Sequence, residues 1–128
     1  MRRVFKTRTF DRWAKRAGLK DPALCEAVAE MVAGQIDARL GGSIFKKRVA
    51  LPGRGKSGST RTLVATNLGT RWYFVFGFEK NERDNITDLE LSALKRLATD
   101  LLKLTDAQIP AALDAETLKE ICNDHNQA

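Results

Sequence analysis

The spacing of hydrophobic residues changes several times along the chain, and each change predicts a different element. Residues 4–10 alternate loosely between apolar and polar side chains, which predicts an edge strand leading into a short basic helix over 11–17. Asp21-Pro22 is typical of a helix start, because aspartate caps exposed backbone N–H groups and proline fits the first helical turn. Apolar residues then recur at helical spacing, so we expect an amphipathic helix over 22–40 that ends at Gly41-Gly42.

The hydrophobic period becomes two after this glycine pair. Residues 44–51 alternate and predict a strand, and the glycine-rich stretch 52–59 predicts a hairpin loop. The β-branched and aromatic runs at 60–66 and 71–78 are separated by a compact turn, and they predict the next antiparallel pair. Together these segments predict a three-strand meander.

A helical pattern returns in the last third of the chain. Thr87 and Glu90 have the spacing of a capping box, in which both side chains satisfy backbone N–H groups at a helix start. A leucine stripe along this helix predicts packing on the sheet, and its members are Leu94, Leu97, Leu101 and Leu104. We expect a last helix over 115–122.

This order of elements predicts an α+β fold. The expected architecture is a small antiparallel sheet, made of the N-terminal strand and the three-strand meander, with helices packed on it. A chain of 128 residues with 43% hydrophobic composition has room for one domain. Within it we expect a main unit at 1–104 and an acidic helical extension of the same domain at 105–128.

Positive charge is unevenly distributed along the chain, which has a net charge of +6 and a pI near 9.6. One basic cluster lies within residues 1–20. A second cluster contains no acid and consists of Lys46, Lys47, Arg48, Arg54, Lys56 and Arg61. Clustered cations favour a polyanionic partner such as nucleic acid, because binding releases counterions. Charge alone is equally consistent with a solvated basic face.

The composition also argues against several classes of protein. No apolar run is long enough to span a bilayer, and the basic N-terminus lacks the apolar stretch of a signal peptide. We therefore expect a cytoplasmic protein with no membrane contact. Cys25 and Cys122 have no CxxC or His-rich surroundings, which predicts buried reduced thiols and no structural metal.

Other catalytic motifs are incomplete. Gly55-Lys56-Ser57 fails as a phosphate-binding loop, because the first glycine of that motif would fall on Ala50. His125 has no partner nearby in the sequence, so we expect a surface histidine. The acids at 79–84 are interleaved with cations, which disfavours a metal site. We expect neither a metal nor another cofactor.

Several basic residues converge if the meander forms as predicted, and these are Lys46, Arg48, Arg61, Lys80 and Arg83. When a 2'-hydroxyl of RNA attacks its own phosphodiester, a proton must leave, negative charge must be stabilised and the leaving oxygen must be protonated. Lysines and arginines can share these tasks without a metal, and crowded like charges lower a lysine pKa. A basic binding surface without catalysis is an open alternative.

These residues belong to a longer pattern. It contains Phe45-Lys46-Lys47-Arg48, then Gly55-Lys56-Ser57-Gly58 before Arg61-Thr62-Leu63, and finally Phe76-Gly77-Phe78 before Lys80-Asn81-Glu82-Arg83. In this order and spacing the motifs resemble those of the RelE/HigB toxin superfamily. The resemblance runs from the N-terminus to about Leu104.

The resemblance implies a microbial ribonuclease fold and the toxin of a type II toxin-antitoxin pair. Such toxins enter the ribosomal A site and cleave messenger RNA there, so the implied partners are the ribosome, mRNA and a cognate antitoxin protein. The implied catalytic residues are Arg61, Lys80, Arg83 and Lys46. The implied RNA-binding residues are Lys47, Arg48, Arg54 and Lys56.

The general base is not apparent from the family pattern. Some members place a catalytic tyrosine shortly after the last motif, whereas residues 85–87 contain none here. Tyr73 lies in mid-strand, and we expect it in the core. Lys46 or Lys80 is therefore the expected general base.

Two other functions stay open. A ParE-like relative would share the fold but inhibit gyrase, and it would not need the whole basic set. A non-catalytic RNA-binding module would interleave exposed aromatic residues with its cations in order to stack bases. Most aromatic residues here occupy expected core positions in strands, which favours the ribonuclease.

Overall fold

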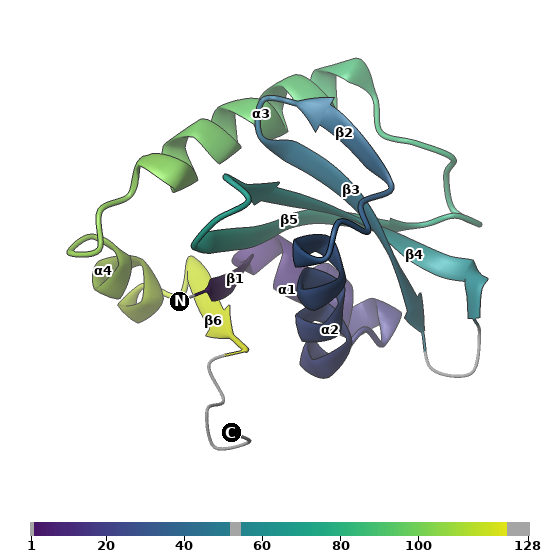
Figure 1. The fold of residues 1–128 in the computed structure, drawn as a ribbon, viewed down its shortest axis with the longest axis horizontal. Helices are drawn as coiled ribbons and strands as arrows, with labels where there is room; N and C mark the ends of the chain where they lie inside the picture. The colour runs from purple at the N-terminus through teal and green to yellow at the C-terminus, as the bar shows by residue number, and fades with distance from the viewer. Residues whose placement is uncertain (1, 52–54, 123–128) are drawn as a thin grey trace.

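The computed structural model describes residues 2–51 and 55–122, except for the side chains of 55–58. Over these ranges the strands are β1 (Arg3–Thr7), β2 (Ala38–Gly41), β3 (Ile44–Leu51), β4 (Gly55–Thr66), β5 (Arg71–Glu79) and β6 (Leu118–Ile121). The helices are α1 (Arg8–Ala17), α2 (Asp21–Val32), α3 (Asp88–Lys103) and α4 (Ile109–Asp114). The α+β class is confirmed (Figure 1).

The sheet is mixed, with strand order β2-β3-β4-β5-β1-β6. The predicted antiparallel meander of β3, β4 and β5 is confirmed. The prediction of a small antiparallel sheet is wrong, because β1 pairs in parallel with β5, with Val4 opposite Trp72. Alternation along a strand is the same in parallel and antiparallel pairs, so the sequence pattern carries no information on strand direction.

The predicted helix over 22–40 ends early, at Val32. Gly34 lies at φ +98°, a left-handed conformation that glycine adopts without the penalty other residues pay, and it follows the last turn of α2. Ala38–Gly41 then forms the edge strand β2, antiparallel to β3. Gly41 is therefore the last residue of β2, and Gly42 belongs to the turn between two strands.

Two further boundaries differ from the prediction. Helix α1 begins at Arg8, because Thr7 accepts a hydrogen bond from the Phe10 N–H at 3.2 Å and so caps the helix. Of the predicted loop over 52–59, residues 52–54 lie outside the described residues and 55–59 belong to β4.

The predicted helix over 115–122 is wrong. Leu118–Ile121 forms β6, which pairs antiparallel with β1 and covers an edge that would otherwise lack backbone partners. Leu118 and Ile121 stand three residues apart, a spacing that also suits a helix. As residues of a strand they point to opposite faces of the sheet, and each joins a different hydrophobic cluster.

Helices cover both faces of the sheet (Figure 1). On the α1/α2 face the core includes Phe10, Leu24, Val28, Phe45, Val64, Trp72 and Phe74. On the α3 face it includes Phe5, Ile44, Leu63, Tyr73, Leu94 and Leu101. The capping box is confirmed, since the Glu90 N–H donates to Thr87 Oγ1 at 3.1 Å and the Thr87 N–H donates to Glu90 Oε1 at 2.8 Å.

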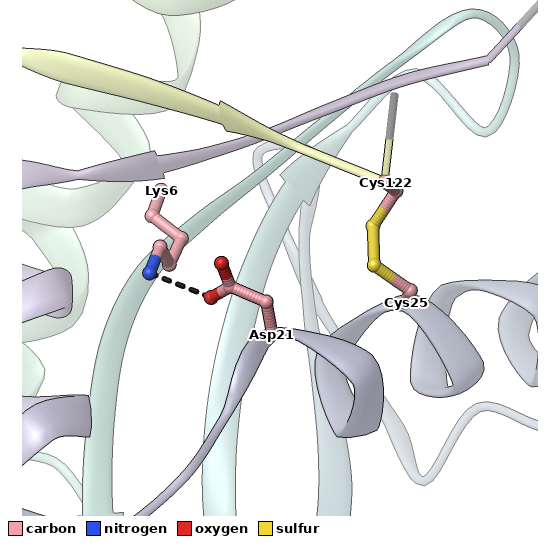
Figure 2. The surroundings of a disulfide bond; sticks show 4 residues. All are labelled: Lys6, Asp21, Cys25 and Cys122. Carbon is pink, nitrogen blue, oxygen red and sulfur yellow. Dashed lines mark hydrogen bonds and ion pairs between the residues drawn. A yellow bond between two sulfur atoms is a disulfide. The ribbon is translucent and has the colours of Figure 1, made fainter. Parts of the chain in front are cut away.

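A disulfide joins Cys25 of α2 to Cys122, which follows β6 (Figure 2). The prediction of reduced thiols is therefore wrong. The two cysteines are 97 positions apart in the sequence, and only the pairing of β6 with β1 brings Cys122 next to α2. Within the ranges described above, none of the helices has the length and apolar composition needed to cross a membrane.

Candidate functional site

Strand alternation places several of the predicted cations on the α3 face. Lys46 and Arg48 share this face with Ile44 of the same strand, and Arg61 shares it with Leu63. Arg61 is paired with Arg48 across β3 and β4, which makes Lys46 its diagonal neighbour. The hydrophobic contacts of α3 do not extend to these positions. This part of the sheet is therefore accessible, with Arg48 exposed and Lys46 and Arg61 half-buried.

Lys46 is held by a neutral partner. Its Nζ donates a hydrogen bond to Asn85 Oδ1 at 3.3 Å, and the same oxygen accepts the Ile86 N–H at 2.9 Å. Asn85 lies in the segment between β5 and α3, so this segment reaches across to β3. The contact leaves the positive charge of the ammonium group uncompensated.

Arg61 also has neutral partners. Its Nη1 donates to the backbone oxygen and to the Oγ of Ser59, both at 3.2 Å. In the described part of the chain, no carboxylate lies within ion-pair distance of Arg61 or Lys46. The charge of these two cations is thus available to an anionic ligand.

Arg83 joins the same region from the segment after β5. Its guanidinium carbon lies 5.7 Å from the ring centres of both Phe76 and Phe78. Phe78 is the residue opposite Arg61 across β4 and β5, so Arg83 is brought beside the strand cations. The Arg83 guanidinium also forms an ion pair with Glu90, through Nη1 to Oε2 at 3.2 Å and through Nη2 to Oε1.

Glu90 and Asp37 compensate two of the cations. Hydrogen bonds from the Arg83 side chain are the main reason why the pKa of Glu90 is lowered to about 2. Asp37 accepts from Arg48 Nε at 3.2 Å and from the Arg48 backbone N–H at 2.7 Å. We call Lys46, Arg48, Arg61 and Arg83 together the basic cluster.

The structure does not bring Lys47 to the basic cluster. Lys47 points to the α1/α2 face, where its side chain is 3% exposed and forms an ion pair with Glu30 at 2.7 Å. Its Nζ also donates to the backbone oxygen of Gln35 at 3.0 Å. These contacts join β3 to α2 and to the segment that follows α2.

The remaining predicted site residues are less well defined. Lys80 is exposed just beyond the end of β5, in the turn that leads to Arg83. Arg54 and His125 lie outside the described residues, and so does the side chain of Lys56. Tyr73 is fully buried in mid-strand, which confirms its predicted place in the core.

An apolar groove of about 590 Å³ lies on the same face as the basic cluster. Phe76 and Leu94 line it, together with Leu97, Leu101 and Leu104 of α3 and the segment that follows. Phe76 also contacts Arg83, so the groove adjoins the basic cluster at this ring.

The comparison with protein families identifies the chain. A model described as the RelE toxin of the RelE / RelB toxin-antitoxin system matches residues 2–121. The chain belongs to the RelE toxin family. A comparison with curated proteins found no match.

Membership of the RelE family makes this protein the toxin of a toxin-antitoxin pair, with a cognate antitoxin as its partner. The matched range reaches Ile121, so it includes α4 and β6 as well as the meander. Residues 105–121, which lie beyond the resemblance in sequence, thus lie within the family match.

Three residues around the basic cluster were missed by sequence reasoning. Asp37 falls in a segment that was predicted as helix, and Asn85 is an ordinary polar residue in a loop. The sequence identifies Glu90 only as the acid of a capping box. Its contact with Arg83 spans seven positions across a loop and a helix start, and no sequence pattern encodes that distance.

Proposed function

We propose that this RelE-family toxin is a metal-independent endoribonuclease that cuts messenger RNA in the ribosomal A site. One observation carries the proposal. Lys46 and Arg61 lie diagonally across two neighbouring strands on an accessible face, and both are held by neutral hydrogen-bond acceptors. A phosphodiester that approaches this face meets two uncompensated cations, which is the arrangement that binding and stabilising a phosphate require.

The reaction follows from the chemistry of RNA. A base removes the proton of the 2'-hydroxyl, the 2'-oxygen bonds to phosphorus, and the bond to the 5'-oxygen breaks as that oxygen takes a proton. The products are a 2',3'-cyclic phosphate and a 5'-hydroxyl end. We assign Arg61 to the negative charge that builds up on the phosphate, and Lys46 or Lys80, in the neutral amine form that a base requires, to the first proton transfer.

Arg48 and Arg83 have a different part in this proposal. Each already has a carboxylate partner, which neutralises much of its charge, so they orient the RNA backbone rather than supply the main electrostatic stabilisation. Lys47 is left out of the proposed site, since its ammonium group is buried on the other face of the sheet.

The ribosome and messenger RNA are the further partners we propose, and the cytoplasm is the compartment where they are found together. Mixing the purified chain with a defined messenger RNA, with and without programmed ribosomes, tests the proposal when the cut positions are mapped by primer extension. We expect cuts only with ribosomes, within A-site codons. Absence of cleavage in both reactions by a folded chain would reject the ribonuclease in favour of gyrase inhibition or RNA binding without catalysis.

A further inference from the structure

Glu90 makes two kinds of contact: its carboxylate is part of the α3 capping box, and it also forms an ion pair with Arg83 of the proposed active site. We propose that Glu90 is a positioning residue that fixes the Arg83 guanidinium for RNA cleavage. The proposal rests on the proposed function and deepens it. Glu90 does not reach the RNA in this scheme, and it acts only through Arg83.

Arg83 is restrained on all three of its side-chain nitrogens. Nε donates to the backbone oxygen of Asn85 at 3.1 Å, and the two Nη atoms donate to the two carboxylate oxygens of Glu90. An arginine has five N–H donors in one plane, so a partner held at both Nη atoms sets the orientation of the whole group. The rings of Phe76 and Phe78 lie beside it, and two N–H bonds stay available for a phosphate.

Glu90 is itself held in place. Its Oε1 accepts the backbone N–H of Thr87 at 2.8 Å. A glutamate with 34% of its side chain exposed would ordinarily sample several rotamers. Here the first turn of α3 fixes the carboxylate, and the carboxylate fixes Arg83.

The restraint extends to the strand cations through Asn85. The backbone oxygen of Asn85 accepts from Arg83, and its side-chain oxygen accepts from Lys46. A continuous series of contacts thus runs from the start of α3 to β3. Releasing Arg83 removes one of the contacts that hold the segment that carries Asn85.

Two variants separate positioning from helix capping. Glu90→Gln keeps an oxygen that can accept the Thr87 N–H, since glutamine also serves in capping boxes, but it removes the charge and one acceptor for Arg83. Thr87→Ala is the matched control, because it removes the hydroxyl that caps Glu90 and leaves the ion pair with Arg83 in place.

Cleavage kinetics with programmed ribosomes give the first measurement. We expect Glu90→Gln to lower kcat about tenfold with little change in KM, because a misplaced group loses transition-state contacts. Thr87→Ala should keep kcat within about twofold while lowering Tm. In an Arg83→Ala background, Glu90→Gln should cause no further loss, because its effect passes through Arg83.

Proton–nitrogen NMR of the arginine Nε–H group gives a measurement that does not depend on catalysis. The Arg83 resonance is assigned by its loss in Arg83→Ala. We expect it to exchange slowly with water in the wild type and in Thr87→Ala, and to exchange rapidly in Glu90→Gln.

The outcomes are distinguishable. If the wild type cleaves RNA and Glu90→Gln is equally active, the positioning role alone is overturned. The same conclusion follows if Glu90→Gln causes as large a loss in the Arg83→Ala background as it does in the wild type. An Arg83 resonance that is unchanged in Glu90→Gln would also overturn it. A wild-type chain that cleaves no RNA would overturn the proposed function together with this consequence of it.

Discussion

Lys46 and Lys47 are neighbours in the sequence, yet they belong to two different parts of the molecule. Lys47 is buried on the α1/α2 face against Glu30, whereas Lys46 lies on the α3 face and donates to the neutral side chain of Asn85. The same residue type therefore stabilises the fold at one position and is available to a ligand at the next. The difference arises because successive side chains of a strand point to opposite faces.

A second buried lysine on the α1/α2 face is also paired with acids. Lys6 is buried there between Asp11 and Asp21, at 2.6 and 2.7 Å, and Figure 2 shows the Lys6–Asp21 contact near the disulfide. Buried cations on this face are matched by acids, as the cost of removing a charge from water requires. On the α3 face, Lys46 and Arg61 lack such acids among the described residues, so charge there is compensated only in part.

The sharpest test of the α3 face is Arg61→Ala. We expect it to reduce RNA cleavage by about 100-fold or more, because it removes a cation that meets the phosphate, and to abolish growth inhibition. Arg96→Ala on α3 is the matched control, since it removes the same charge from an exposed residue that is not part of the basic cluster. Full toxicity of Arg61→Ala with normal Tm would show that the site is misassigned.

The sharpest test of the α1/α2 face is reduction of the disulfide. Cys25–Cys122 closes a loop across 97 positions, so breaking it should lower the stability by about 3 kcal/mol and Tm by roughly 10 °C. Thermal unfolding with and without a dithiol reductant measures this. The variant with both cysteines replaced by serine should melt at the reduced value in either buffer. An unchanged Tm on reduction would mean that the bond does not stabilise this face.

The comparison of the two lysines is tested by paired substitutions. Lys47→Ala should cost about 2 kcal/mol of unfolding free energy, because it removes the buried ion pair with Glu30 and empties buried space. Lys46→Ala should change the stability by less than about 0.5 kcal/mol and should instead lower the rate of RNA cleavage. Denaturant unfolding and cleavage kinetics on both variants provide the data. If Lys46→Ala lowered the stability and Lys47→Ala instead lowered only the rate of cleavage, the assignment of the two lysines to opposite faces would be wrong.

A smaller effect is expected for acid denaturation of the α1/α2 face. Burial would by itself raise the pKa of Asp11, but hydrogen bonds from Lys6, Lys15 and Lys119 outweigh it and lower the pKa from 3.8 to about 2. Asp11 therefore contributes stability at neutral pH that is lost as the pH falls from about 4 to about 2.

Asp11→Asn tests this pH dependence. Its Tm should be lower than that of the wild type at neutral pH, and the difference should narrow as the pH falls through this window. Thermal unfolding at several pH values measures the difference. A constant difference between the two proteins would contradict the assignment of Asp11.

Much of the fold could be predicted because it rests on local patterns. The capping box of Thr87 and Glu90, the leucine stripe of α3 and the meander of β3, β4 and β5 all followed from spacing alone. The failures concern β2 and β6, short strands whose sequences also suit a helix. β2 pairs with β3, which follows it in the sequence, and β6 pairs with β1 at the other end of the chain. In both cases the pairing with another strand decided the outcome against local propensity.

For the candidate site, the sequence by itself determined the inventory of cations and the alternation that separates Lys46 from Lys47. These properties depend on residue type and on a period of two. Only the tertiary structure decided that Asn85, Glu90 and Asp37 would be the partners of those cations, and that Cys25 would meet Cys122. Such contacts join segments whose distance in space is set by the packing of helices on the sheet, and no local pattern of side chains records that distance.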